Sequence, residues 1–329
     1  MLVQGLIFLF GLGVLYLGAE WLVRGSASLA LHYGIRPLVV GITVVAIGTS
    51  MPELVVNVFA ALSGEDSLAL GNIVGSNICN IALILGMTAL VIPLVVRPGT
   101  LKKEYPIMMG VMLVFYAVAL DGTIGRSDGL LLVSGLIGFF VYLIYDAKRH
   151  SGLPVKHDPG ASSDESGESK DASDALAETQ TARRLILVAG GMVFLGVGAR
   201  AMVYAAVNVA AVLAIDPVVV GLTVVAIGTS LPELAASVVS ALKQEADISL
   251  GNILGSNLLN VLFVVGLISL FRPLNVEQTS LEIHFPVMIG FGIVLLPLAW
   301  TRFQITRMEG GFLVAGFTGY ILFLVAPYL

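Results

Sequence analysis

The chain has 329 residues, of which 57% are apolar by a wide count and only 12% are charged. Soluble domains carry about a quarter charged residues, so this composition indicates an integral membrane protein embedded in a lipid bilayer. The formal net charge of −5, four His and one Cys offer no basic surface for nucleic acid and no Cys/His cluster for zinc or an iron–sulfur centre.

The N-terminal residues predict a first membrane-spanning helix that is retained, because the run is long and has no basic segment before it. A span requires about 20 predominantly apolar residues. Ten segments qualify: 2–23, 37–62, 70–93, 104–121, 127–146, 184–204, 212–242, 250–271, 281–300 and 309–328. We therefore expect an all-α membrane protein.

Residues 147–183 interrupt this pattern with a polar, acidic stretch that is rich in Ser, Asp and Glu. Such a composition buries too little apolar surface to fold alone. We expect a flexible linker that joins a first five-helix half, residues 1–146, to a second half, residues 184–329. A regulatory role for the linker is the alternative interpretation.

The loops after the odd-numbered spans hold 14 of the 17 Lys and Arg residues. Basic residues concentrate in the cytoplasmic loops of membrane proteins. We therefore expect these loops and the linker to be cytoplasmic and both termini to face outward.

The two halves repeat each other at an offset of 180 residues. "GITVVAIGTSMPEL" (41–54) matches "GLTVVAIGTSLPEL" (221–234), and "GNIVGSNICN" (71–80) matches "GNILGSNLLN" (251–260), with 19 of these 24 positions identical. Because each half has five spans, an odd number, the second half must be inverted in the membrane. Inverted repeats are typical of secondary transporters, which bind substrates near the bilayer midplane where the repeats meet.

Within the repeats, four spans each carry three oxygen-bearing side chains at positions i, i+4 and i+8. The four sets are Thr49, Glu53 and Asn57; Asn72, Ser76 and Asn80; Thr229, Glu233 and Ser237; and Asn252, Ser256 and Asn260. An ionisable residue inside a membrane helix is energetically costly and by default functional. Glu53 and Glu233 are therefore the central candidates for a binding site.

Hard cations prefer such oxygens, and Ca2+ takes about six to eight of them. Proline also breaks each helix beside the Glu, which predicts that the carbonyls of Ala46 and Ala226 are freed to face a ligand. Two carboxylates match the charge of one Ca2+, although several Na+ ions or protons remain alternatives. Asn72 and Asn252 have a structural alternative, because such side chains often only tie membrane helices together, and Cys79 is interpreted as packing.

The paired "GTSMPEL…GNIVGSNICN" and "GTSLPEL…GNILGSNLLN" motifs closely resemble the two alpha-repeats of the sodium/calcium exchanger family. The resemblance covers essentially the whole chain and is strongest to the compact prokaryotic calcium/sodium antiporters. It implies ions bound between helices 2, 3, 7 and 8, with helices 1 and 6 as a sliding pair. The ion-binding positions that it carries over are Ala46, Thr49, Ser50, Glu53, Ser76, Asn80, Ala226, Thr229, Ser230, Glu233, Ser256 and Asn260.

One position departs from some family members, which have Asp where this chain has Asn260. That change removes a carboxylate and weakens the case for potassium co-transport. The resemblance implies an inner-membrane Na+/Ca2+ antiporter with no cofactor and no enzymatic activity. A proton/Ca2+ antiporter that uses the same two Glu residues is the nearest alternative, and a channel or a cation sensor are more distant ones.

Overall fold

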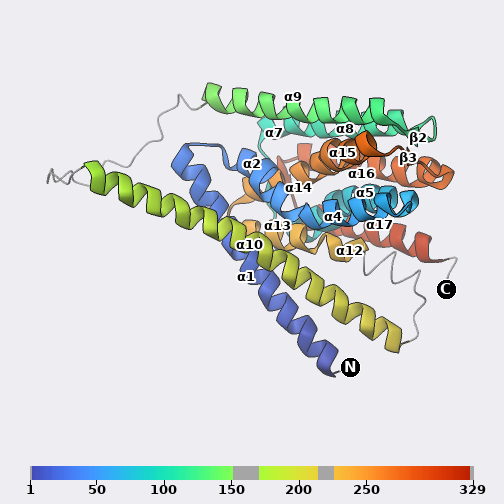
Figure 1. Cartoon of the computed structure of the whole chain (residues 1–329), viewed down its shortest axis with the longest axis horizontal. Coiled ribbons are helices and arrows are strands. Elements are labelled where there is room, and N and C mark those ends of the chain that lie inside the picture. The colour runs from blue at the N-terminus through green and yellow to red at the C-terminus, as the bar shows by residue number, and fades with distance from the viewer. Residues whose placement is uncertain (1, 151–169, 214–225, 327–329) are drawn as a thin grey trace.

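The computed structural model is a helix bundle to which the two halves of the chain contribute equivalent elements (Figure 1). It describes residues 2–150, 170–213 and 226–326, with side chains for 2–146, 180–213 and 227–326. The first half consists of α1 (Leu2–Tyr33), α2 (Pro37–Val40), η1 (Gly41–Val45), α3 (Ala46–Thr49), α4 (Met51–Leu62), α5 (Asp66–Ile78), η2 (Cys79–Ile84), α6 (Leu85–Val91), β1 (Leu94–Val95), α7 (Pro98–Lys102), α8 (Glu104–Ala119), β2 (Thr123–Ile124) and α9 (Arg126–His150).

The second half follows the same order. Its described elements are α10 (Lys170–Val212), α12 (Ala226–Thr229), α13 (Leu231–Leu242), α14 (Ala246–Leu259), η4 (Asn260–Val265), α15 (Gly266–Phe271), β3 (Leu274–Asn275), η5 (Ser280–His284), α16 (Phe285–Trp300), β4 (Gln304–Ile305) and α17 (Arg307–Val325). The η segments are single π-helical stretches inside otherwise α-helical spans.

Each of the ten expected spans contains helix of the described chain. Seven helices are long and apolar enough to cross a membrane, and the bent run from Pro37 to Leu62 makes an eighth. The ninth is α8, which has only 16 residues. The tenth contains α12 and α13, and its first part, residues 214–225, lies outside the described residues.

Four two-residue strands modify the expectation of an all-α protein. β1 pairs with β4, and β2 pairs with β3, both antiparallel. Each pair joins a strand from one half to a strand from the other. β1 and β3 follow the central helices α6 and α15, whereas β2 and β4 follow α8 and α16. The two pairs therefore tie the two repeats together.

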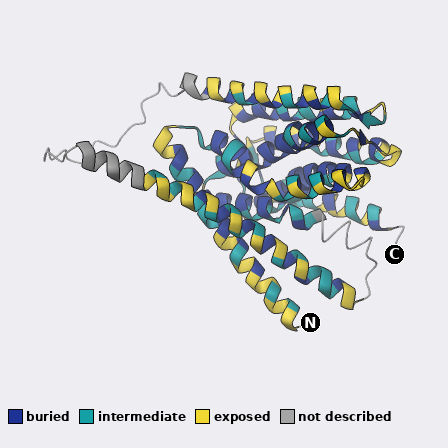
Figure 2. Ribbon diagram, in the orientation of Figure 1, coloured by how far each residue is buried: buried dark blue, intermediate teal, exposed yellow. Residues whose placement is uncertain are grey.

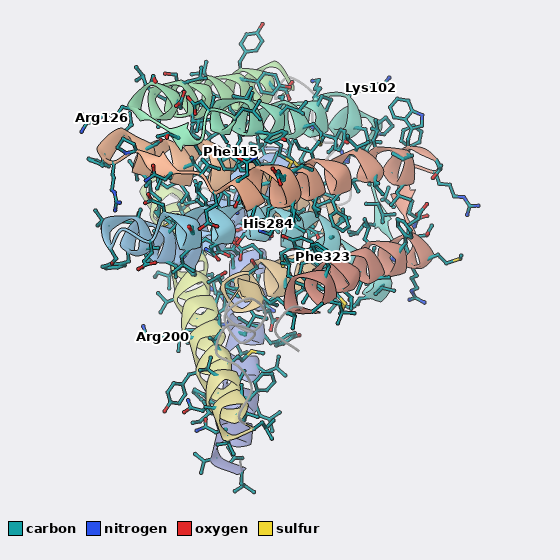
Figure 3. All side chains as sticks on the ribbon, turned by 90° about the vertical axis from the view of Figure 1, so that its right-hand side faces the viewer. Lys102, Phe115, Arg126, Arg200, His284 and Phe323 are labelled. Atoms are coloured by element: carbon teal, nitrogen blue, oxygen red, sulfur yellow. The ribbon has the colours of Figure 1, made fainter. Side chains whose placement is uncertain are left out.

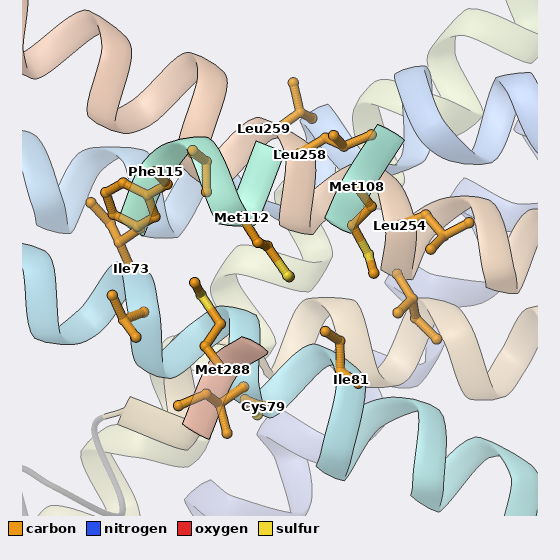
Figure 4. Close-up of a cluster of buried hydrophobic side chains, with 14 of the residues drawn as sticks. Ile73, Cys79, Ile81, Met108, Met112, Phe115, Leu254, Leu258, Leu259 and Met288 are labelled. Atoms are coloured by element: carbon orange, nitrogen blue, oxygen red, sulfur yellow. The ribbon is translucent and has the colours of Figure 1, made fainter. Parts of the chain in front are cut away.

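The spans with the central repeat motifs occupy the middle of the bundle. In the most apolar windows, 78% of the α5–α6 span and 83% of the α14–α15 span is buried, against 22% of α1 and α17 and 28% of α9. Figure 2 shows this contrast between dark central helices and yellow outer ones. Side chains of α8 and α16, including Met108, Met112, Phe115 and Met288, fill the space beside the central helices (Figure 4).

The helices α1 and α10 lie side by side and extend away from the remaining helices (Figures 1 and 3). Their backbones approach closely at glycines. A Cβ on Gly18 would lie 2.6 Å from the Leu195 nitrogen, and one on Gly191 would lie 2.6 Å from the Leu22 nitrogen. Small residues permit such close contact between membrane helices.

An ion cluster fixes the start of α2 to two outer helices. The Arg36 guanidinium lies 2.8 Å from an Asp146 oxygen and 3.6 Å from a Glu104 oxygen, and the Lys103 ammonium lies 2.7 Å from the other Asp146 oxygen. The hydrogen bond with Asp146 raises the pKa of the Lys103 ammonium. Lys103 therefore stays charged at neutral pH, and the cluster holds α2 against α8 and α9.

Helix extends further into the expected linker than its composition predicts. α9 continues to His150, and α10 begins at Lys170. The centre of the linker, residues 151–169, lies outside the described residues.

Candidate ion-binding site

The site is built around the sharp bend that separates α3 from α4. The two parts of this span differ in direction by 48°, and Ser50 is the residue between them. Pro52 occupies the first turn of α4, where the absence of an N–H group is tolerated. The expected break is confirmed.

The expectation that this break frees the Ala46 carbonyl is wrong. That carbonyl accepts a hydrogen bond from the Ser50 amide at 3.0 Å. Pro52 withholds the i−4 hydrogen bond from Gly48 instead.

The second half is interrupted at the equivalent residue, Ser230, which separates α12 from α13. The Ser230 amide donates to the Ile227 carbonyl at 3.1 Å, which is an i to i−3 contact. Ala226 begins α12, and its side chain lies outside the described residues. The expectation that the Ala226 carbonyl is freed stays a prediction.

The bends place Glu53 and Glu233 in the first turns of α4 and α13, and each is only 1% exposed. Each carboxylate accepts a hydrogen bond from the motif serine of the opposite repeat. The Ser50 hydroxyl donates to Glu233 at 2.9 Å, and the Ser230 hydroxyl donates to Glu53 at 3.3 Å. The positive end of each helix dipole also stabilises a carboxylate at this position. The two repeats thus share one polar centre.

Within the described residues, neither Glu53 nor Glu233 forms an ion pair with a basic side chain. Each has one carboxylate oxygen, Oε2, that is buried and accepts no hydrogen bond there. A buried carboxylate without a counter-charge is strongly unfavourable. The pair therefore requires either cations or protons to compensate its charge.

Further buried oxygens have the same property. Ser76 Oγ, Asn80 Oδ1 and Asn260 Oδ1 are buried and have no hydrogen-bond partner among the described residues. Ser256 is fully buried, and its hydroxyl accepts from Ser50 at 3.1 Å. Buried polar atoms are normally satisfied, so a set of unsatisfied oxygens is what a bound cation would complete.

A second layer of amides surrounds this centre. Asn252 accepts from the Thr49 hydroxyl at 3.1 Å and donates to Ser237 at 3.0 Å. In the other repeat, Asn72 accepts from Thr229 at 3.5 Å and donates to Asn57 at 3.0 Å. These bonds join neighbouring helices, and they support the interpretation of Asn72 and Asn252 as helix-tying residues.

The twelve predicted positions are therefore not equivalent in the structure. Side-chain hydrogen bonds join Ser50 to Glu233 and to Ser256, and join Ser230 to Glu53. The two threonines contact the amide layer, while Ser76, Asn80 and Asn260 are buried on the central spans without a bond to either carboxylate in the described chain.

Sequence reasoning missed Asn77, which is fully buried and accepts a hydrogen bond from the Asn260 amide at 3.2 Å. It could have been found, because Asn77 and Asn257 are identical between the repeat motifs. Cys79 is buried close to Met288 (Figure 4), in agreement with its interpretation as a packing residue. In the described residues no three His, Cys, Asp or Glu side chains gather to hold a metal ion.

Comparison with known proteins places this geometry in a family. The sequence profile of the family described as sodium/calcium exchanger protein matches residues 3–145 and 184–326. The chain belongs to the sodium/calcium exchanger family. It is thus a multi-pass membrane transporter of the cation/calcium exchange type and not an enzyme.

Members of the sodium/calcium exchanger family resemble the chain over almost its whole length. The sodium/calcium exchanger MaX1 of Methanosarcina acetivorans is 31% identical, with 98% of each chain covered. The inner membrane protein YrbG of Escherichia coli is 33% identical and covers 100% of this chain and 98% of its own. A structure of the sodium-calcium exchanger NCX_Mj soaked with Na+ and Ca2+ superposes with a TM-score of 0.79 at 30% identity, covering 98% of both chains. These matches confirm the expected fold and family.

Proposed function

We propose that this chain is a secondary active antiporter that exchanges Ca2+ for Na+. The observation that carries the proposal is the pair of buried carboxylates, Glu53 and Glu233, which are bonded to serines of opposite repeats and have no basic partner in the described chain. Their combined charge matches one Ca2+, and the surrounding hydroxyl and amide oxygens suit Ca2+ and Na+ alike. The names of MaX1 and NCX_Mj as sodium/calcium exchangers support the same choice.

Ion binding is assigned in this proposal to oxygens from both repeats. The proposed ligands are Glu53, Glu233, Thr49, Thr229, Ser50, Ser230, Ser76, Ser256, Asn80, Asn260 and the backbone carbonyl of Ala226. The Ala46 carbonyl is left out of this set, because it accepts hydrogen bonds from the Ser50 amide and the Thr49 hydroxyl. Na+ and Ca2+ compete for these shared oxygens, so one ion leaves when the other binds. An empty site carries two buried charges without cations, so the transporter does not readily switch its access across the membrane without a bound ion. This requirement couples the Na+ flux to the Ca2+ flux.

We infer alternating access from the uneven burial of the residues around the proposed site. Thr49 and Asn252 are fully buried, whereas Thr229 and Asn72 are partly exposed. The buried side lies where η1 crosses α14, at a contact so close that a Cβ on Gly41 would lie 2.5 Å from the Ile248 carbonyl oxygen. We assign this closed side to the cytoplasm, because the adjoining loops carry most of the basic residues.

The same argument gives the proposed placement in the cell. Both termini face outward, the loops after odd-numbered spans are cytoplasmic, and residues 147–183 join the two repeat domains on the cytoplasmic side. The E. coli relative is named an inner membrane protein, which supports a prokaryotic inner membrane as the location.

A proton/Ca2+ antiporter is the alternative that the site geometry also favours, because protons would equally compensate Glu53 and Glu233. Purified full-length protein in proteoliposomes separates the two. Uptake of radiolabelled Ca2+ is measured with gradients of Na+, K+ and pH imposed one at a time. We expect uptake to follow the Na+ gradient. Uptake that follows only the pH gradient would replace this proposal with the proton alternative.

A further inference from the structure

We infer that Asn77 is a positioning residue that fixes the orientation of the Asn260 side chain, so that the amide oxygen faces the bound ions. The inference rests on the proposed function of the site. Asn77 is absent from the proposed ligand set and is not itself required to touch an ion. Its effect is exerted through the amide of Asn260.

The contact joins the two repeats at the edge of the site. Asn77 lies near the end of α5, Asn260 is the first residue of η4, and their side chains are 0% and 1% exposed. The Asn260 Nδ2 donates to Asn77 Oδ1 at 3.2 Å. Asn260 Oδ1 is buried and has no hydrogen-bond partner among the described residues.

The orientation of this amide decides what Asn260 offers to a cation. One end of the group is an oxygen acceptor and the other is an NH2 donor of nearly the same shape. If the amide rotated by half a turn, it would present N–H groups to the cation and repel it. An acceptor that binds the NH2 end therefore keeps the oxygen directed toward the site.

Asn77 is oriented in turn by α16. Its Nδ2 lies 3.7 Å from the sulfur of Met288. A thioether accepts hydrogen bonds weakly and never donates them, so this contact directs the NH2 end of Asn77 toward Met288. The oxygen end of Asn77 is then directed toward Asn260. Side-chain contacts thus run from Met288 on α16 through Asn77 on α5 to Asn260 at the start of η4.

The second repeat contains the same asparagine without the same contact, and so provides a matched control. Asn257 is 1% exposed, and its Nδ2 donates to the Ile253 carbonyl of its own helix at 2.7 Å. It makes no hydrogen bond to Asn80 in the described chain. Of the two site amides, Asn260 is thus the one held from the opposite repeat.

The test compares Asn77→Leu and Asn77→Ser with Asn257→Leu and Asn257→Ser in the full chain. Equilibrium binding of radiolabelled Ca2+ to the purified protein and the Ca2+ dependence of flux are measured for variants that elute as folded protein. We expect the Asn77 variants to raise the Kd and KM for Ca2+ about ten- to hundredfold, the usual effect of removing a group that orients a ligand. The flux of the Asn77 variants at saturating Ca2+ should stay close to that of the wild type. In the Asn257 variants, the Kd and KM for Ca2+ should also stay close to the wild-type values.

A double substitution tests whether Asn77 acts through Asn260. In the Asn260→Ser background, Asn77→Ser should cause no further loss of Ca2+ affinity, because the amide that it orients is gone. The inference would be overturned if the losses of Ca2+ affinity multiplied in the double variant. It would also be overturned if the Asn77 variants bound Ca2+ as tightly as the Asn257 variants. The Ca2+ binding measurement needs no Na+ gradient, so it tests the role of Asn77 separately from the proposed exchange. If the wild type shows no Na+-driven Ca2+ flux, the proposed exchange is refuted, and the binding data still decide the role of Asn77.

Discussion

At the scale of single residues, Glu53 and Glu233 supply the only negative charge that the proposed site has for its ions. Replacing either by Gln preserves the side-chain size and an oxygen acceptor for the partner serine, but removes half of this charge. Ca2+ affinity depends on the number of charged ligands. We therefore expect each substitution to lower Na+-dependent Ca2+ flux by roughly a hundredfold, which is a loss of about 2.7 kcal/mol.

The control for these variants is Glu65→Gln, which makes the same chemical change at an exposed position before α5. Flux in proteoliposomes should be unchanged by it. The amount of protein inserted in the membrane should be equal for all three variants. Near-normal flux in Glu53→Gln or Glu233→Gln would show that ion binding does not depend on the two carboxylates.

Residue spacing was sufficient to predict that Glu53 and Glu233 are buried, because a charged side chain in an apolar span has to face the bundle interior. It was not sufficient for Ala46, whose carbonyl remains hydrogen-bonded to the Ser50 amide. Nor did it indicate the contact between Asn77 and Asn260, since that contact depends on how α5 packs against η4. Contacts between helices are set by tertiary packing rather than by periodicity within one helix.

At the scale of elements, the crossing of η1 and α14 brings two helix backbones into close contact beside the site. A Cβ on Gly251 would meet the Leu38 carbonyl and lie 2.9 Å from the Gly41 Cα. Gly251→Ala should therefore lower the stability by about 1–3 kcal/mol through overpacking.

Thermal unfolding in detergent checks this expectation. Gly138→Ala is the control, because it makes the same change at an exposed position of α9, where an added Cβ meets no atom of the described residues within 4 Å. It should leave the melting temperature close to that of the wild type. Equal destabilisation by both substitutions would contradict the tight packing at the crossing of η1 and α14.

The helical spans themselves were predictable because their apolar runs are long and the prolines mark the breaks. The π-helical stretches η1, η2 and η4 were not, since a change from i−4 to i−5 hydrogen bonding leaves no clear mark in the apolar pattern. The strand pairs were also missed, because two residues are too few to show an alternating pattern.

At the scale of the whole molecule, duplication and inversion explain why one site receives one Glu from each half. The α5–α6 and α14–α15 spans, which carry two of the four motifs, are far more buried than the outer spans and lie in the centre of the bundle. The serine of each repeat reaches the carboxylate of the other, and neither half has a complete site alone. The inverted arrangement could be predicted from the 180-residue offset and the odd number of spans, whereas the reciprocal bonds required the structure.

The most direct test of the central claim is equilibrium binding of radiolabelled Ca2+ to the purified full-length chain, titrated with Na+ at constant ionic strength. If the two repeats form one shared site, the chain binds one Ca2+, Na+ displaces it, and both Glu53→Gln and Glu233→Gln weaken binding. Ca2+ that Na+ does not displace, or that binds undiminished when either Glu is replaced, would contradict a shared site.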